Sequence, residues 1–284
     1  MRLVHKINEV REQVREWKRE GLSVGFVPTM GALHAGHLSL IKKSVEKCDR
    51  TVVSIFVNPI QFGPSEDLDK YPRTLDADCE VAKDADLIFA PTPAEMYGEG
   101  FRLSNDYLTY VIPPYFYMDK LCGKSRVGHF DGVCTVVNKF FNIVQPDFAF
   151  FGEKDRQQLI IIKKMVKDLN IPIEIIGCPI VREESGLALS SRNSYLTPEE
   201  KEDALALSKL LFNIKKCYKQ GLTDASALKE TAFNYLNSHH NLEYLDFRDE
   251  ENLEEKSIID DRTIAFIAVK IGNVRLIDNI SLKD

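Results

Sequence analysis

Residues 28–37, which read PTMGALHAGH, constrain the fold more than any other stretch of the chain. The apolar run 24–27 before them predicts a strand, and the two glycines allow a sharp turn with a close backbone approach. Apolar side chains then recur at helical spacing from about Gly36 to Lys47, and the β-branched run 51–57 predicts a buried parallel strand. Such a strand–turn–helix–strand unit exposes a helix N-terminus, whose free N–H groups and positive dipole favour a phosphate.

Two histidines make this turn more specific. His34 and His37 lie three residues apart at the start of the predicted helix, so both rings can face one ligand. Imidazole N–H groups donate to phosphate oxygens, and a phosphate favours the charged ring. A structural role and a metal site are the alternatives. A helical zinc pair normally has four-residue spacing and a third ligand nearby, so metal binding ranks low.

Composition narrows the possible partners. The 284 residues carry a net charge of −6 without a basic block, which argues against nucleic acid as the main ligand. No apolar run has the length of a membrane span, and the charged N-terminal residues do not resemble a signal peptide. The six cysteines are scattered without a C-x-x-C pair, as in proteins of reducing compartments. We therefore expect a cytoplasmic protein with no nucleic-acid or membrane partner.

A polar pair follows the predicted strand 51–57. Asn58 and Gln61 lie in the run FVNPIQF, just past the carboxyl end of this strand. Open α/β sheets bind their ligands at the carboxyl ends of the strands, so the pair is a candidate for ligand binding. Capping of a turn is the alternative use of such side chains.

The run GEKDRQQ at residues 152–158 makes a second strand–glycine–helix junction, after the apolar residues 147–151. Lys154 supplies a mobile point charge that suits phosphates, and the carboxylate of Asp155 can accept from ribose hydroxyls. Helix capping by Asp155 and a solvated Lys154 are the ordinary alternatives. The junction therefore indicates nucleotide binding without proving it.

Two further runs combine basic and polar side chains. SRVGHFDGV at residues 125–133 contains Arg126 and His129, and GLALSSRN at residues 186–193 joins two serine hydroxyls to Arg192. An arginine in a hydroxyl-rich loop can clamp an anion with two parallel hydrogen bonds. However, arginine is most often a solvated surface charge, and serine-rich loops are usually only loops.

The order of predicted elements indicates two domains. Strands and helices alternate up to about Arg182 and include a plausible strand over residues 108–112. Helices followed by strands come after Arg182, with Gly272-Asn273 as a two-residue hairpin turn. This pattern predicts an α/β domain with a parallel sheet over residues 1–182 and a smaller α+β domain with antiparallel strands over residues 183–284.

Taken together, these runs resemble one family. HAGH is similar to the HIGH signature of the nucleotidyltransferase superfamily, which includes class I aminoacyl-tRNA synthetases. PTMGALHAGH, FVNPIQF, GEKDRQQ and GLALSSRN resemble, in this order, motifs of the pantoate–β-alanine ligases. SRVGHF differs from the usual SRPGHF of that family at Val127. The lysine pair of the KMSKS loop is absent, which counts against a tRNA synthetase.

The resemblance implies a Rossmann-like parallel-sheet domain with helices on both faces, followed by a small C-terminal lid domain. It implies ATP-dependent condensation of (R)-pantoate with β-alanine to pantothenate, a step toward coenzyme A. The route would pass through pantoyl adenylate and release AMP and pyrophosphate. Mg²⁺, with unknown protein ligands, and a homodimer are also implied. Another HIGH-type nucleotidyltransferase, or less readily a non-catalytic ATP-binding module, is the alternative.

The resemblance also implies roles for individual residues. Catalysis is implied for His37, His34, Lys154 and Arg192. ATP binding is implied for Met30, Gly31, Ala32, Leu33, His34, Ala35, Gly36, His37, Gly152, Glu153, Lys154, Asp155, Val181, Leu189, Ser190, Ser191 and Arg192. Pantoate binding is implied for Gln61, Gln158 and Asn58, and β-alanine binding for Gln61, His129 and Arg126.

Overall fold

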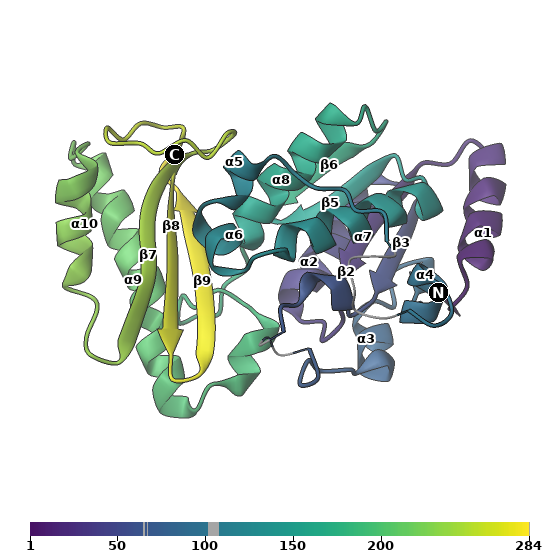
Figure 1. Cartoon of the computed structure of the whole chain (residues 1–284), viewed down its shortest axis with the longest axis horizontal. Helices are drawn as coiled ribbons and strands as arrows, with labels where there is room; N and C mark the ends of the chain where they lie inside the picture. The colour runs from purple at the N-terminus through teal and green to yellow at the C-terminus, as the bar shows by residue number, and fades with distance from the viewer. Residues whose placement is uncertain (65, 67, 102–107, 284) are drawn as a thin grey trace. The chain divides into compact units, whose positions relative to one another are not determined.

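The computed structural model describes residues 1–64, 66, 68–101 and 108–283 and contains two compact units (Figure 1). The first unit comprises Met1–Glu153 and Ile161–Pro179, and the second comprises Lys154–Ile160 and Ile180–Asp284. The domain boundary that we place near Arg182 remains a proposal, because compactness alone does not show that residues 1–182 fold independently.

The first unit is built on a six-stranded sheet in which every neighbouring pair is parallel, as predicted. The strand order is β1-β4-β3-β2-β5-β6, so β2 lies inside the sheet between β3 and β5. The strands are β1 (Arg2–Val4), β2 (Val24–Thr29), β3 (Arg50–Ile55), β4 (Leu87–Phe89), β5 (Phe148–Gly152) and β6 (Glu174–Cys178). The sequence had not predicted β1, which has only three residues.

Helices cover both faces of this sheet, which confirms the predicted fold class (Figure 1). Side chains alternate between the faces along a strand. Val27 therefore packs with Ile41 of α2 in the core on one face, whereas the ring of Phe26 lies 5.6 Å from that of Phe140 of α7 on the other. Burial on both faces explains why β2 and β3 are rich in apolar and β-branched residues and lack an alternating polar face.

The helices up to the end of α8 include α2 at its predicted position, from about Gly36 to Lys47. They are α1 (Ile7–Arg19), α2 (Ala35–Lys47), η1 (Pro59–Gln61), α3 (Leu75–Val81), α4 (Pro93–Tyr97), α5 (Tyr115–Met118), α6 (Leu121–Ser125), α7 (His129–Val144), η3 (Glu153–Asp155) and α8 (Arg156–Asp168).

The strand predicted over residues 108–112 is wrong, since this segment has no regular secondary structure. The N–H group of Val111 donates instead to Thr135 Oγ1, at 2.9 Å. Pro113 and Pro114 follow directly and have no N–H group to donate to a neighbouring strand.

The second unit contains a three-stranded antiparallel sheet, β7-β8-β9, against which α9 and α10 pack (Figure 1). Its elements are η4 (Ser191–Tyr195), α9 (Pro198–Lys219), α10 (Ala225–Phe233), β7 (His240–Asp249), β8 (Thr263–Ile271) and β9 (Val274–Ser281). Gly272 and Asn273 alone join β8 to β9, as predicted. The smaller antiparallel part that the sequence predicts is thus confirmed.

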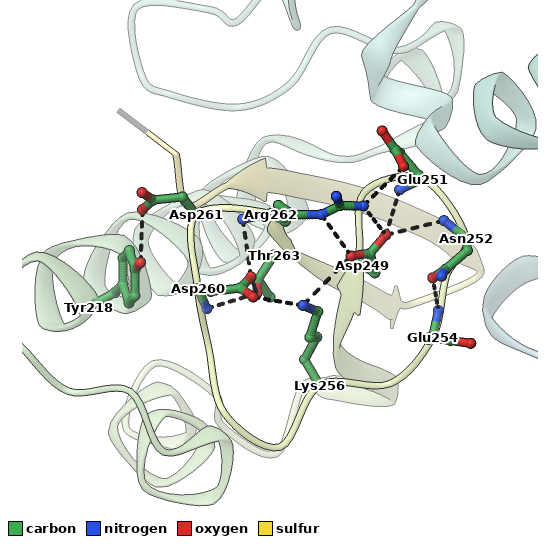
Figure 2. A network of polar contacts seen from close by, with 10 residues as sticks. All are labelled: Tyr218, Asp249, Glu251, Asn252, Glu254, Lys256, Asp260, Asp261, Arg262 and Thr263. Atoms are coloured by element: carbon green, nitrogen blue, oxygen red, sulfur yellow. Dashed lines mark hydrogen bonds and ion pairs between the residues drawn. The ribbon is translucent and has the colours of Figure 1, made fainter.

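A polar network closes the loop between β7 and β8 (Figure 2). Asp249 is 5% exposed, and its carboxylate accepts from the N–H groups of Glu251 and Asn252 at 3.0 and 3.3 Å. Arg262 Nε donates to the same carboxylate at 3.2 Å, and Lys256 Nζ lies 3.6 Å from it. Burial alone would raise the pKa of Asp249, but these donors hold it below its usual range.

We expect Asp249→Asn to lower the free energy of unfolding by about 1.5–3 kcal/mol at neutral pH, the scale for hydrogen bonds to a charged group. A folded-state pKa below the unfolded value means that this stabilisation is present above the ordinary carboxyl pKa of about 3.9 and is lost as pH falls through the folded pKa. The melting temperatures of wild type and variant should therefore converge in acid. Glu254→Gln, in the same loop, is the matched control, because its exposed carboxylate makes no bond shown in Figure 2. A constant difference from pH 7 to pH 3 would contradict the assignment.

Candidate active site

The sheet order places two of the predicted motifs at neighbouring strand ends. The chain proceeds from β2 to β3 on one side, whereas β5 pairs with β2 on the other side. The order in which strands are added to the sheet therefore reverses at β2. Open α/β sheets bind ligands at such a reversal, just outside the carboxyl ends of the strands. PTMGALHAGH begins with the last two residues of β2 and continues past its carboxyl end. Gly152 is the last residue of β5, and Glu153 follows it.

A buried carboxylate shapes the turn after β2. Gly31 has φ +87°, and a Cβ there would lie 2.9 Å from Asp78 Oδ2, so only glycine suits this position. Asp78, in α3, is 2% exposed and accepts from the N–H groups of Ala32 and Leu33 at 3.1 and 2.7 Å. Asp78 is not among the site residues predicted from the sequence. Its partners are 46 and 45 positions away, and no local pattern indicates the contact.

His34 and His37 lie together at the N-terminus of α2, with ring centroids 4.2 Å apart. His34 Nδ1 accepts from the N–H group of Gly36 at 3.1 Å, and His37 Nδ1 accepts from the N–H group of His34 at 3.3 Å. A nitrogen that accepts a hydrogen bond carries no proton, so we assign the ring proton to Nε2 in both residues. The histidines thus cap the helix, which is the structural role that we named as the alternative to ligand binding. Each ring also has an Nε2–H group of the kind that donates to an anion.

Gln61 lies beside this turn, at the end of η1. Its Nε2 contacts Met30 Sδ at 3.1 Å, and its Oε1 accepts from Asn58 Nδ2 at 2.9 Å. Gln61 is 7% exposed and Asn58 only 1%. Met30 and Gln61, predicted to bind different substrates, are therefore in direct contact in the first unit.

Arg126 and His129 form a chain that ends on the backbone of Gln61. Arg126 donates from Nε and Nη2 to the two carboxylate oxygens of Glu66, at 2.7 and 2.6 Å. Its Nη1 lies 2.9 Å from His129 Nε2, and His129 Nδ1 lies 2.8 Å from the carbonyl oxygen of Gln61. Because a carbonyl only accepts, we place the His129 proton on Nδ1. Burial would raise the pKa of Glu66, but the hydrogen bonds and charge of Arg126 lower it below its usual range.

The side chain at position 127, where the family usually has proline, is 90% exposed. Gly128 follows it with φ +79° and caps α7. Val127 therefore fills no packed position, and Arg126 and His129 keep their bonds on either side of it.

In the second unit, Lys154 is anchored through its backbone. Asn279 of β9 is 4% exposed, and its Nδ2 donates to the carbonyl oxygen of Lys154 at 2.9 Å. The neighbouring Asp278 forms a two-point ion pair with Arg182, with N–O distances of 2.6 and 2.9 Å. Arg182 Nη1 also donates to the carbonyl oxygen of Gly186, at 3.1 Å. Lys154 and the loop that begins at Gly186 are thus held by adjacent residues of one strand.

The loop 186–193 contains four of the predicted ATP residues, Leu189 to Arg192. Leu189 N–H donates to the carbonyl oxygen of Val181 at 3.0 Å, which brings these two residues together. Ser190 caps η4 by accepting from the N–H group of Arg192 at 3.3 Å. Asn193, 7% exposed, fixes the loop through a 3.1 Å bond to the carbonyl oxygen of Ala188.

Each unit therefore gathers its own set of predicted site residues. In the first unit, Met30 to His37 adjoin Gln61, which in turn adjoins Asn58 and His129. In the second unit, hydrogen bonds and an ion pair of Asn279, Asp278 and Arg182 connect Lys154 with the loop 186–193. Among the described residues, no group of three or more His, Cys, Asp or Glu side chains could hold a metal ion. The described helices include none that is both long and apolar enough to cross a membrane.

A parallel sheet whose inner strand leads into a histidine-capped helix N-terminus defines the class of open α/β proteins with a candidate anion site at the carboxyl ends of the strands. Comparison with known proteins narrows the class. The family model described as pantoate-beta-alanine ligase matches residues 2–281, so the chain belongs to the pantoate–β-alanine ligase family, whose enzymes form pantothenate.

Relatives and solved structures agree with this assignment. The chain is 52% identical to the pantothenate synthetase of Ruminiclostridium cellulolyticum, over 99% of each chain. It is 48% identical to that of Clostridium botulinum, over 100% of each. A crystal structure of the Thermus thermophilus enzyme superposes with a TM-score of 0.92 at 40% identity and full coverage of both chains. The Francisella tularensis ligase, described as complexed with beta-gamma ATP and beta-alanine, gives a TM-score of 0.80 at 36% identity, with 99% and 98% coverage.

Proposed function

We propose that this ligase joins (R)-pantoate to β-alanine through an adenylate. The pantoate carboxylate attacks the α-phosphorus of ATP and expels pyrophosphate; the β-alanine amine then attacks the acyl carbonyl and expels AMP. A carboxylate is a nucleophile without a base, so the main tasks are to align two anions and to stabilise charge that moves onto pyrophosphate. The observation that carries the proposal is the His34–His37 pair at the N-terminus of α2, in which both Nδ1 atoms accept backbone hydrogen bonds, so that we assign the ring protons to Nε2.

We propose ATP contacts for the residues of the two predicted motifs and the serine loop. His37, His34, Lys154 and Arg192 are the proposed charge-stabilising groups. The remaining ATP contacts are proposed for Met30, Gly31, Ala32, Leu33, Ala35, Gly36, Gly152, Glu153, Asp155, Val181, Leu189, Ser190 and Ser191. The beta-gamma ATP named for the Francisella tularensis ligase supports this substrate.

Pantoate is proposed to bind Gln61 and Gln158, whose amide N–H groups suit a carboxylate and hydroxyls. Asn58 is buried and donates to Gln61, so its proposed contribution is made through Gln61. β-Alanine is proposed to bind near Gln61, with its carboxylate toward Arg126 and His129. The β-alanine named for the Francisella tularensis ligase supports this second substrate.

Three further properties are proposed from the family. Mg²⁺ is proposed to arrive on ATP oxygens and water, since the described side chains offer no cluster for it. A homodimer is proposed from the family resemblance alone. A cytoplasmic location is proposed because the six scattered cysteines, with no C-x-x-C pair among them, suit a reducing compartment.

The adenylate route is tested by isotope exchange. With ATP, Mg²⁺ and pantoate present and β-alanine absent, we expect labelled pyrophosphate to enter ATP, because the first half-reaction needs no amine. Adding β-alanine should then release AMP. Omitting pantoate is the control and should abolish exchange. Formation of ADP and phosphate, or exchange that requires β-alanine, would overturn the adenylate route.

A further inference from the structure

The side chain of Gln61 is at the end of a partly buried hydrogen-bond chain that begins at Tyr97. Tyr97, the last residue of α4, donates from its hydroxyl to Asn58 Oδ1 at 2.6 Å. Asn58 Nδ2 donates to Gln61 Oε1 at 2.9 Å, and Gln61 Nε2 then faces Met30 Sδ at 3.1 Å. Tyr97 is thus connected to the turn after β2 through two amide side chains and belongs to none of the predicted motifs.

The backbone of α7 fixes the direction of this chain. Asn58 Nδ2 lies 3.2 Å from the carbonyl oxygen of Gly132, which can only accept, so this corner of the Asn58 amide must be the donor. The Asn58 oxygen then faces Tyr97, and the group of Gln61 that faces Asn58 must be its oxygen. A Cβ at Gly132 would lie 2.3 Å from the carbonyl oxygen of Ile60, so glycine is required for this close approach of α7 to η1.

The surroundings of Tyr97 keep its hydroxyl group in place as a hydrogen-bond donor. Its ring lies 6.2 Å from that of Phe56 and 4.9 Å from that of Phe101, measured between centroids. Lys139 Nζ lies over the same ring at 5.5 Å. Burial raises the pKa of the Tyr97 hydroxyl above its ordinary value, so the hydroxyl keeps its proton at neutral pH. The hydroxyl has one proton, and that proton is directed to Asn58.

We propose that Tyr97 is a positioning residue that acts through Asn58 to hold the Gln61 amide with its Nε2 donor facing the turn at Met30. This inference rests on the proposed function, in which Gln61 binds pantoate. A donor suits an anionic carboxylate, whereas a reversed amide would present its oxygen to that anion. The thioether of Met30 is a weak acceptor, so an anionic oxygen readily replaces it as the partner of Nε2.

Tyr97→Phe tests the proposal in the full-length enzyme. The substitution keeps the ring and removes the donor, leaving the buried Asn58 oxygen unpaired and the Gln61 amide less restrained. We expect the KM for pantoate to rise about 5- to 30-fold, the range for losing one buried hydrogen bond. The KM for ATP should stay near that of wild type. Tyr218→Phe is the matched control, because it removes a tyrosine hydroxyl that donates to Asp261 at 2.8 Å in the second unit (Figure 2).

A double-mutant cycle with Gln61→Ala separates positioning from general structure. If Tyr97 acts through Gln61, adding Tyr97→Phe to Gln61→Ala should not raise the pantoate KM further. An equal rise in both backgrounds, or no rise for Tyr97→Phe alone, would overturn the positioning role. If Gln61→Ala itself leaves the pantoate KM unchanged, the proposed function of Gln61 fails, and with it this inference. If Gln61→Ala raises the pantoate KM and Tyr97→Phe does not, the proposed function of Gln61 is retained and only the positioning role of Tyr97 is excluded.

Discussion

Replacing Lys154 with alanine should lower kcat/KM by about 10²–10³, the scale for losing one preorganised group that stabilises transition-state charge. The lysine follows the end of β5, and we propose that its ammonium group pairs with ATP phosphates as their charge redistributes. The expected loss is kinetic and not structural. Asn279 holds Lys154 through the backbone carbonyl oxygen, and this bond persists when the side chain is shortened.

Steady-state kinetics and thermal unfolding together decide this prediction. Lys154→Gln keeps much of the side-chain length without the charge, so it should show a similar loss. Lys209→Ala is the matched control in the same unit, because that lysine lies in α9 at 4.0 Å from an exposed carboxylate of Glu202. An intact melting temperature with wild-type kinetics in Lys154→Ala would remove Lys154 from the catalytic groups.

Local chemistry made the turn after β2 predictable. Glycine marks the positive φ at position 31, and two histidines with helical spacing mark the start of α2, so both the turn and its candidate function follow from ten consecutive residues. The parallel sheet was equally predictable, because strands buried on both faces require continuous apolar runs. In these places short-range sequence patterns decide the structure.

Long-range contacts account for what the sequence did not predict. Asp78 reaches the turn across 46 residues, and Tyr97 reaches Asn58 across 39. Neither has a spacing that distinguishes it from an ordinary helix residue. The strand predicted over residues 108–112 does not form, for a related reason. An apolar segment becomes a strand only beside a partner strand, and here the N–H group of Val111 bonds to a helix side chain instead.

We expect His37 both to cap α2 and to donate a hydrogen bond to phosphate, so its substitution should have the second large effect on the reaction rate. Its Nδ1 accepts from the backbone N–H of His34 and so helps to cap α2, which places the ring proton on Nε2. The structural and chemical roles thus belong to different atoms of one ring. A substitution that keeps the Nδ1 acceptor and removes the Nε2 donor should therefore retain the fold and lose the chemistry.

His37→Asn is that substitution, because the amide oxygen of asparagine can take the place of Nδ1 while nothing replaces Nε2–H. We expect adenylate formation in single turnovers to slow by about 10²–10³, with little change in melting temperature, since a donor to moving phosphate charge is lost. His37→Gln is the matched variant. Its longer side chain can place an N–H group near the position of Nε2 and should recover part of the rate. If both variants weakened pantoate binding as much as they slowed the chemical step, His37 would be a positioning residue. If His37→Asn lost stability but kept its rate, helix capping would be the only role of the ring.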